Sequence, residues 1–182
     1  DLNSIQGILR NVDIIINAAA LKQVPTCEYF PYEAVRTNVE GPQNIVTAIA
    51  NNGCKVDTVV CVSTDKACKP VNVMGMTKAI QERIFMHGNM KCSETRFVGV
   101  RYGNVLASRG SVIPLFINQI QNGGPVTITN PSMSRFLLSL DDAVDTIFFA
   151  VKEAERGELI IPNPPSALVE DVADVIIGNR SI

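Results

Sequence analysis

Four residues with hydroxyl, carboxylate and ammonium groups, Ser63-Thr64-Asp65-Lys66, follow one another near the middle of the chain. They end an unbroken apolar run, Val59–Val62, whose β-branched residues predict a strand buried on both faces. Because ligands bind at the carboxyl ends of strands in open α/β sheets, chemistry is expected at this point. A helical pattern then begins at Met74 and brings Lys78 back toward the strand end. An acid beside a base, with a second lysine over them, predicts a proton-transfer site.

The same residues have simpler interpretations. Residues 63–65 could cap a turn, because serine, threonine and aspartate bond to nearby backbone groups. Lys66 and Lys78 could be solvated surface charges. Met74 and Met76 could fill the core at the start of a helix, which is the commonest role of methionine.

Composition limits the class of protein. With 182 residues, of which 46% are hydrophobic and 19% charged, the chain suits one globular domain and is not disordered. A net charge of −2 gives no electrostatic basis for binding nucleic acid. No apolar run approaches the roughly 20 residues that cross a bilayer, so no membrane segment is expected. The five cysteines lack C-x-x-C spacing, which favours reduced thiols in a cytoplasmic protein without a metal site.

Predicted strands alternate with predicted helices along the chain. Asp13–Asn17 predicts a short buried strand that ends in Ala18-Ala19-Ala20, where a ligand could approach the backbone or a helix could pack. A long helix begins near Tyr32 and carries Asn38 on its buried face, where a polar residue requires a specific hydrogen-bond partner. Thr95–Tyr102 predicts a further strand that ends in polar groups. This alternation predicts βαβ units and a parallel sheet.

The remaining predictions concern shorter segments. They are a helix over 2–9, a loop over 22–25, a helix from 74 to 88, a helix over 113–121, strands over 126–129, 135–140 and 159–161, a helix over 143–154 with Asp141 as its N-cap, and a helix over 169–177. The chain starts at Asp1 without methionine, stops just after an apparent helix, and contains no G-x-G-x-x-G. We therefore expect that both ends are truncated and that any dinucleotide fingerprint lies upstream.

Four segments in this order carry a resemblance to a known family: NAAALKQVPTCEYFPYEAVRTNV, VVCVSTDKACKPVNVMGMTK, VRYGNVLASRGSVIPLF and VTITNPSMSRFLLSLDDAV. The chain resembles the extended short-chain dehydrogenases/reductases. More narrowly, it is similar to the UDP-N-acetylglucosamine 4,6-dehydratase (5-epimerising) group of polysaccharide biosynthesis. The resemblance implies an α/β fold with a Rossmann-like doubly wound parallel sheet, partial because the first βαβ units are missing. It also implies that 1–107 is the C-terminal part of an NAD(P)-binding Rossmann domain and that 108–182 is a small irregular substrate-binding lobe.

The resemblance also implies roles for single residues. The superfamily's Tyr-x-x-x-Lys pair falls on Met74 and Lys78, so the usual tyrosine is missing, and methionine has no titratable proton. Lys78 is still expected to bind the nicotinamide ribose. The other implied cofactor-binding residues are Ala18, Ala19, Ala20, Asn38, Ser63, Tyr102, Gly103 and Asn104. The implied substrate-binding residues are Lys22, Asn104, Arg109, Ser111, Thr127 and Arg135.

The implied reaction gives Asp65 and Lys66 separate tasks. Oxidation of sugar C4 by NAD or NADP acidifies the C5 proton, which Lys66, partly desolvated, would take as a neutral base. Asp65 would protonate the departing C6 hydroxyl, and Thr64 would lie beside them. The expected product is a 4-keto-6-deoxy UDP-sugar for capsule, O-antigen or glycan precursors.

Several questions stay open at the level of the sequence. The chain does not distinguish NAD from NADP, the exact UDP-sugar, or inversion from retention at C5. A UDP-sugar 4-epimerase or reductase of the same superfamily, or a non-catalytic binding module, remains an alternative. The resemblance further implies a homo-oligomer, and these 182 residues alone are expected to be inactive.

Overall fold

The computed structural model describes the chain except residues 53–54, 109 and 179–182. It divides into two compact units. The first contains Asp1–Arg101 and Asp145–Pro162, and the second contains Tyr102–Val144 and Asn163–Ile182. The chain thus leaves the first unit, returns to it, and leaves it again, and each unit is described separately below.

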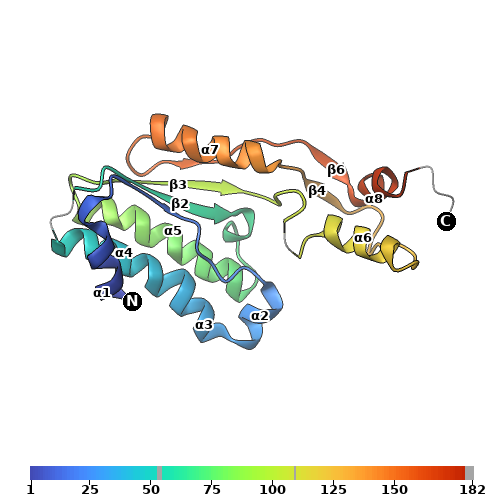
Figure 1. The fold of residues 1–182 in the computed structure, drawn as a ribbon, viewed down its shortest axis with the longest axis horizontal. Helices are drawn as coiled ribbons and strands as arrows, with labels where there is room; N and C mark the ends of the chain where they lie inside the picture. Colours follow the sequence, from blue (N-terminus) through green and yellow to red (C-terminus); the bar gives the residue numbers. More distant parts are fainter. Residues whose placement is uncertain (53–54, 109, 179–182) are drawn as a thin grey trace. The chain divides into compact units, whose positions relative to one another are not determined.

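The first unit is built on a four-stranded sheet with the order β1-β2-β3-β5 (Figure 1). Its strands are β1 (Ile14–Asn17), β2 (Thr58–Thr64), β3 (Arg96–Tyr102) and β5 (Leu159–Ile160). β1 pairs with β2 in parallel, and so does β3 with β5. In Figure 1 the arrows of β2 and β3 also point the same way. The predicted parallel α/β sheet is therefore confirmed.

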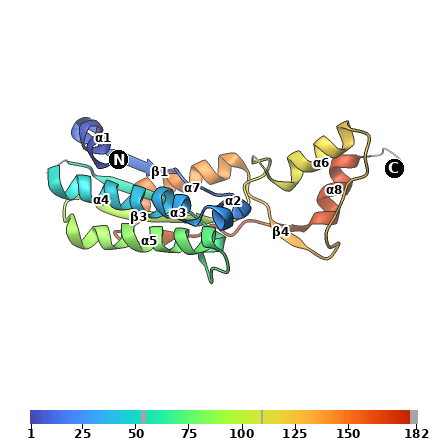
Figure 2. The same ribbon diagram turned by 90° about the horizontal axis from the view of Figure 1, so that it is seen from below.

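Helices cover both faces of this sheet. Figures 1 and 2 show α4 (Gly41–Asn52) and α5 (Val73–Lys91) side by side on one face, and the first-unit part of α7 (Leu140–Glu153) lies on the other. α1 (Leu2–Ile8), followed by the 3-10 turn η1 (Leu9–Asn11), contacts α4. Phe85 of α5 and Phe97 of β3 are fully buried, and their rings stack 6.2 Å apart between sheet and helices. Burial of such rings is a major source of stability in an α/β unit.

The segment between β1 and α4 is more helical than the sequence predicted. The loop prediction over 22–25 is wrong in its second half, because α2 (Val24–Tyr29) begins there. Pro25 lies in the first turn of α2, where its missing N–H costs nothing. α3 (Pro31–Val35) and a π-helical turn, η2 (Arg36–Glu40), then lead into α4. The single predicted helix from Tyr32 is thus interrupted by a π turn at the position of Asn38.

The second unit contains fewer regular elements. α6 (Val112–Gln121) contacts α8 (Val169–Ile177), and β4 (Ser134–Phe136) pairs with β6 (Ser166–Leu168) in an antiparallel ribbon. The predicted strand over 126–129 is wrong: Thr127 bonds through both its amide and its hydroxyl to the Gln119 side chain. Side-chain bonds of this kind replace the backbone ladder that a strand requires.

The boundary between β4 and α7 also differs from the prediction. The strand expected over 135–140 ends at Phe136, and α7 begins at Leu140. Asp141 lies inside the helix, so its predicted role as N-cap is wrong. Ser139 is the cap instead: its hydroxyl accepts the Asp142 N–H at 3.0 Å and donates to the Asp142 carboxylate at 2.6 Å.

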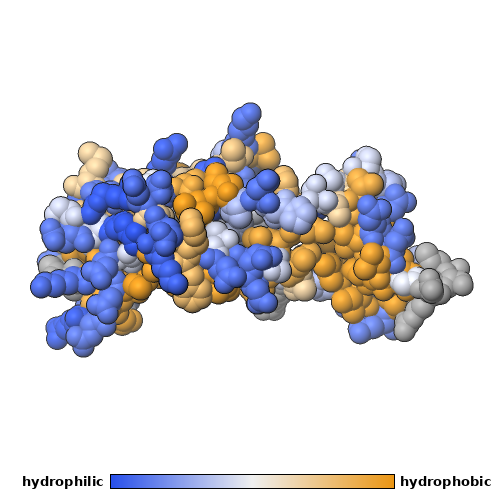
Figure 3. Space-filling view, turned by 90° about the horizontal axis from the view of Figure 1, so that it is seen from above, coloured by the Kyte–Doolittle hydropathy of each residue, from blue (hydrophilic) through white to orange (hydrophobic). Residues whose placement is uncertain are grey.

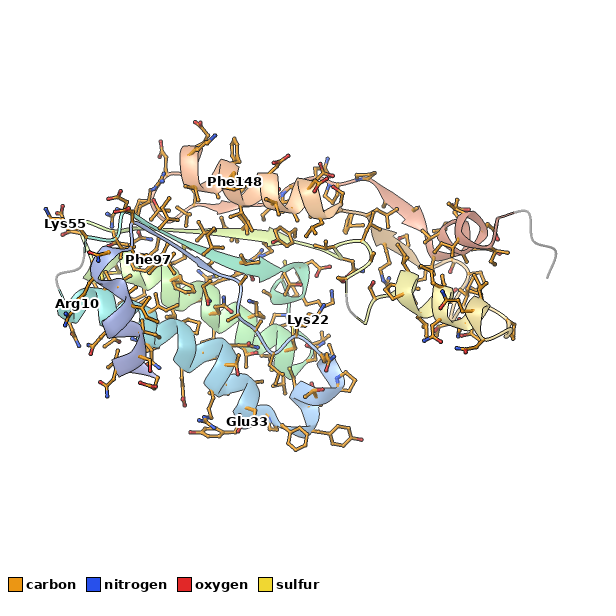
Figure 4. All side chains as sticks on the ribbon, in the orientation of Figure 1. Arg10, Lys22, Glu33, Lys55, Phe97 and Phe148 are labelled. Carbon is orange, nitrogen blue, oxygen red and sulfur yellow. The ribbon has the colours of Figure 1, made fainter. Side chains whose placement is uncertain are left out.

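The outer surface of α7 is partly apolar. Phe148 and Phe149 are 54% and 52% exposed, and Figure 4 shows Phe148 projecting away from the sheet. The face seen in Figure 3 accordingly mixes apolar and hydrophilic surface. Across the described residues, no helix combines the length and apolar character needed to cross a membrane.

Candidate active site

The end of β2 places an acid and a base side by side. Ser63 and Thr64 are the last residues of β2, and Asp65 and Lys66 begin the 3-10 turn η3 (Asp65–Ala67). Thr64 caps this turn, since its hydroxyl oxygen accepts the Lys66 N–H. The Lys66 ammonium donates to Asp65 Oδ1 at 3.0 Å, and the Thr64 hydroxyl donates to the same oxygen at 2.8 Å. The predicted acid–base pair is therefore an ion pair with a third hydrogen-bonding partner.

The ion pair is open to solvent. The Lys66 and Asp65 side chains are 40% and 42% exposed, so Lys66 lacks the partial desolvation expected for it from the sequence. Partial burial would raise the pKa of Asp65, but hydrogen bonds from Lys66 and Thr64 outweigh it and hold that pKa below its ordinary value. At neutral pH Asp65 is thus a carboxylate, and it faces the Lys66 ammonium.

Lys78 has a very different environment. It is only 5% exposed, and its ammonium donates to the Val62 carbonyl and to Gln81 Oε1, both at 2.7 Å. Gln81 in turn donates to the buried Cys61 thiol at 3.3 Å. Burial lowers the pKa of Lys78. The interpretation of Lys78 as a solvated surface charge is wrong: α5 inserts it beneath the end of β2.

Ser63 belongs to a second buried network. Its hydroxyl donates to Glu82 Oε1 at 2.5 Å. Arg101, near the end of β3, forms a two-point ion pair with the same carboxylate, with Nε–Oε1 and Nη2–Oε2 distances of 3.0 and 2.6 Å. Hydrogen bonds with Glu82 raise the pKa of Arg101. This network joins β2, α5 and β3. The buried Ser63 hydroxyl donates its hydrogen bond to Glu82 and therefore not to a ligand.

Asn38 fixes the segment that carries Lys22. Its amide oxygen accepts the Leu21 N–H at 2.8 Å, and its amide nitrogen donates to the Leu21 carbonyl and to the Thr77 hydroxyl, both at 3.0 Å. These bonds meet the sequence expectation of a specific partner for a buried asparagine. The exposed Lys22 follows Leu21 directly, so Asn38 holds the backbone from which Lys22 projects.

Met74 is a core residue at the first turn of α5. It is 4% exposed and packs with Cys27 and Ala34. A thioether in this position fills space and transfers no proton. Met74 therefore packs in the core, as one of the two interpretations from the sequence expected. Met76, for which the same was expected, is 48% exposed and is not a core residue.

The carboxyl end of β1 combines small exposed side chains with a buried polar group. Ala18, Ala19 and Ala20 follow the strand and are exposed, and their small side chains allow close approach to the backbone. Asn17 is 7% exposed, and its amide nitrogen has no hydrogen-bond partner among the described residues. A buried donor without a partner calls for a ligand or water. Lys78 also has a third N–H donor beyond its bonds to the Val62 carbonyl and Gln81.

The second unit contains a cavity of about 340 Å³. Four residues predicted for the substrate line it, namely Asn104, Ser111, Thr127 and Arg135. Apolar residues, among them Phe116 and Met133, make up much of the remaining wall. Arg109, also predicted for the substrate, lies outside the described residues. Tyr102, at the end of β3, is half buried, and burial raises its pKa.

Some important residues were missed by the sequence analysis. Gln81 and Glu82 lie one turn after Lys78, on the buried face of α5. Polar residues on such a face require buried partners, and this pattern was the available signal. Gly75, between Met74 and Lys78, was also missed.

The fold is that of the extended short-chain dehydrogenases/reductases. The model of the family described as polysaccharide biosynthesis protein matches residues 1–181, and the chain belongs to this family. A protein of Rickettsia akari named UDP-glucose 4-epimerase is 49% identical over 175 residues, which are 95% of this chain and 51% of that protein. The chain thus spans about half the length of the curated relatives it matches.

Solved structures agree with this assignment. The Pen protein from Bacillus thuringiensis superimposes with a TM-score of 0.90 at 40% identity, over 97% of this chain and 54% of that one. The dTDP-glucose 4,6-dehydratase DesIV from Streptomyces venezuelae, solved with NAD and TYD, gives 0.87 at 20% identity, over 97% and 60%. At that identity the second match concerns the fold alone.

Proposed function

We propose that this chain carries the acid–base and substrate-binding parts of a nucleotide-sugar 4,6-dehydratase that acts on UDP-N-acetylglucosamine or a related UDP-sugar. The observation that carries the proposal is the Asp65–Lys66 pair, held 3.0 Å apart at the carboxyl end of β2. Removal of water across C5 and C6 needs a base for one carbon and an acid for its neighbour. Met74, at the position of the usual tyrosine, cannot supply either.

A bound NAD or NADP would accept hydride from C4 of the sugar and later return hydride to C6. Lys78, Asn17 and residues 18–20 are the groups proposed to hold it, through a ribose hydroxyl, an amide contact and close backbone approach. Of the earlier cofactor candidates, Asn38 and Ser63 act indirectly, since their polar atoms bond to Leu21, Thr77 and Glu82. Tyr102, Gly103 and Asn104 remain candidates at the end of β3.

The ion pair must change its protonation before it can react. Asp65 is ionised in the resting ion pair, whereas elimination needs a neutral amine and a protonated carboxyl. Transfer of one proton along the Lys66–Asp65 hydrogen bond converts both groups at once. A substrate that covers this exposed pair would favour the neutral form, because desolvation disfavours charges. Lys66 then takes the C5 proton, and Asp65 protonates the C6 hydroxyl, which leaves as water.

The cavity of the second unit is the proposed binding site for the UDP part. Ser111 is the N-cap of α6, yet its hydroxyl is buried without a partner among the described residues. The N-terminus of a helix together with a hydroxyl donor binds phosphate oxygens well. Arg135 adds positive charge, and the apolar wall suits a uracil ring.

The alternative is a UDP-sugar 4-epimerase. It is favoured by the names of the curated relatives, of which the protein of Rickettsia akari is one. An epimerase inverts C4 and has no need of a second acid–base pair for C5 and C6. The Asp65–Lys66 pair would then be an ordinary surface ion pair, of the kind that contributes about 0–1 kcal/mol.

Mass spectrometry of the sugar after incubation of the complete protein in deuterated water separates the two functions. The dehydratase loses water and acquires deuterium at C5, whereas the epimerase does neither. In the complete protein, Asp65→Asn and Lys66→Ala should each slow the loss of water about 10²–10⁴-fold, the usual worth of acid or base catalysis. Affinity for the UDP-sugar should change little. A wild-type product without water loss and without deuterium at C5 would refute the dehydratase, and inversion at C4 in that product would support the epimerase.

A further inference from the structure

The first turn of α5 lies directly against the turn that carries Lys66. A Cβ atom added to Gly75 would come closer than 3.0 Å to the Lys66 carbonyl oxygen, and 3.1 Å from Pro70 Cβ. Real Cβ atoms essentially never approach a carbonyl oxygen so closely. Asn72, the N-cap of α5, lies at the same contact, and its side-chain oxygen accepts the Gly75 N–H at 2.8 Å. Only glycine fits at this position of the helix.

The loop between the two turns is constrained as well. The Asp65 carbonyl accepts the Cys68 N–H at 2.9 Å, and Lys69 adopts a φ of 50°, which non-glycine residues rarely do. Glu28 of α2 accepts the Val73 N–H at 2.8 Å and so anchors the start of α5 from the other side. The chain therefore returns from Lys66 to Gly75 over a short path with little freedom to adjust.

Of the two segments that meet at Gly75, the helix is the one that cannot move. Beyond its first turn, Thr77, Lys78 and Glu82 fasten α5 to Asn38, to the Val62 carbonyl and to Arg101. All three side chains are buried. At η3, by contrast, the Lys66 and Asp65 side chains are 40% and 42% exposed. A side chain at position 75 would therefore displace Lys66 and leave α5 in place.

We propose that Gly75 is a positioning residue for the Asp65–Lys66 pair, because its missing side chain lets the anchored helix α5 support the Lys66 backbone. This inference rests on the proposed function of the pair. The contact at Gly75 links the helix that carries Lys78 to the turn that carries the acid and the base. The geometry of the proton-transfer groups is then fixed relative to the cofactor lysine through one backbone contact.

The test compares Gly75→Ala with Gly7→Ala in the complete protein. Both glycines lie in α-helices, so both substitutions gain helix propensity. At Gly7, in α1, an added Cβ meets nothing within 4 Å. Gly7→Ala is therefore the control for backbone effects.

The first measurement does not depend on catalysis. Titration of the Asp65 carboxyl carbon by NMR reports whether Lys66 still faces it. The pKa of Asp65 should rise toward its ordinary value in Gly75→Ala and stay at the wild-type value in Gly7→Ala, since the hydrogen bonds from Lys66 and Thr64 hold it down. An unchanged pKa of Asp65 in Gly75→Ala overturns the proposal.

The second measurement follows the pair in action. Incorporation of deuterium at C5 should fall about 10²-fold in Gly75→Ala, the usual cost of displacing a reacting group by about 1 Å. Cofactor affinity should remain within about twofold, because α5 and Lys78 stay in place. Joint loss of cofactor binding and C5 exchange would mean general disruption and would overturn the proposal. A wild-type protein without C5 exchange would refute the proposed function, whereas the titration would still decide the role of Gly75.

Discussion

Two lysines near the end of β2 differ in almost every physical property. Lys66 is exposed and paired with Asp65, whereas Lys78 is buried and bonded to neutral oxygens of Val62 and Gln81. A buried ammonium without a carboxylate in direct contact is costly, which is why its pKa falls. Such an arrangement is retained where a charge is useful, here beside the proposed ribose site.

Met74 provides a test of packing against chemistry at a single residue. Met74→Leu roughly conserves volume in the small cluster with Cys27 and Ala34. In the complete protein this variant should keep most of its activity, as measured by kcat for water loss. A decrease of about 100-fold or more would show that the sulfur itself has a role that core packing does not explain.

Cys61 predicts a specific dependence of stability on alkaline pH. Burial raises the pKa of its thiol from 9.0 to about 12, although the Lys78 ammonium opposes the shift. The neutral thiol therefore contributes stability that is complete below 9.0 and is lost as the pH rises toward about 12. Over this interval the wild type should lose up to about 1.4 kcal/mol per pH unit relative to Cys61→Ala.

Urea unfolding at pH values on both sides of 9.0 measures this difference. The exposed Cys68→Ala is the control and should parallel the wild type. If the stability difference between wild type and Cys61→Ala stays constant across this range, the thiol ionises as readily in the folded protein as in the unfolded chain.

The sequence predicted which residues gather at the end of β2 but not how they bond. Asp65 and Lys66 are neighbours in the chain, so the sequence alone places the two side chains in the same turn. The partners of Lys78 are Val62, 16 residues away, and Gln81, on the same helix. The long-range bond depends on the register of α5 against β2, which local patterns do not specify. The close approach at Gly75 depends on the same register.

At the scale of the elements, the π turn η2 explains how Asn38 reaches its partners. The extra residue per turn interrupts the α-helical ladder at residues 36–40 and places Asn38 among buried groups. π turns are frequent at functional sites. Asn38 there bonds to both the N–H and the carbonyl of Leu21. It also bonds to Thr77, and so connects the segment after β1 to α5.

Replacement of Asn38 should release this connection. Asn38→Leu keeps a similar volume but leaves the Leu21 N–H and C=O unpaired in a buried place, which should cost about 2–4 kcal/mol. Urea unfolding gives the free energy of unfolding. The control is Asn51→Leu at the exposed end of α4, which should change this free energy by about 0.5 kcal/mol or less. Equal losses of unfolding free energy in the two variants would contradict a stabilising role for the Asn38 hydrogen bonds to Leu21.

Helices with a clear apolar stripe were predicted well, and short irregular elements were not. The expected helix over 169–177 coincides with α8, and the strand over 95–102 nearly coincides with β3. The errors at residues 24–25, 126–129 and 141 have local causes. In each case proline chemistry or a side-chain hydrogen bond decided the backbone conformation, and periodicity does not report either.

At the scale of the whole molecule, the chain divides its tasks between two units. The first holds the acid–base pair together with Lys78, Asn17 and residues 18–20, and the second holds the cavity with Ser111 and Arg135. The chain crosses between the units repeatedly, so neither is one continuous stretch. Homo-oligomer formation stays a prediction.

These 182 residues alone should bind NAD or NADP weakly and convert no UDP-sugar. The glycine-rich turn that supplies much of dinucleotide affinity through a helix N-terminus does not occur in the sequence. Titration calorimetry with each dinucleotide measures this directly. Micromolar affinity for this chain would refute the prediction and would mean that the groups around β1 and Lys78 suffice for binding.

The Glu82 network has a consequence for hydrogen exchange. Its carboxylate joins Ser63 of β2 to Arg101 of β3, and each of these partners is 19 residues away in the chain. Amides of α5 near Glu82 should therefore exchange with solvent only when the whole first unit opens, whereas the amide of the exposed Lys66 should exchange through small local fluctuations. The acid–base pair would then lie next to a helix that opens only when its unit unfolds.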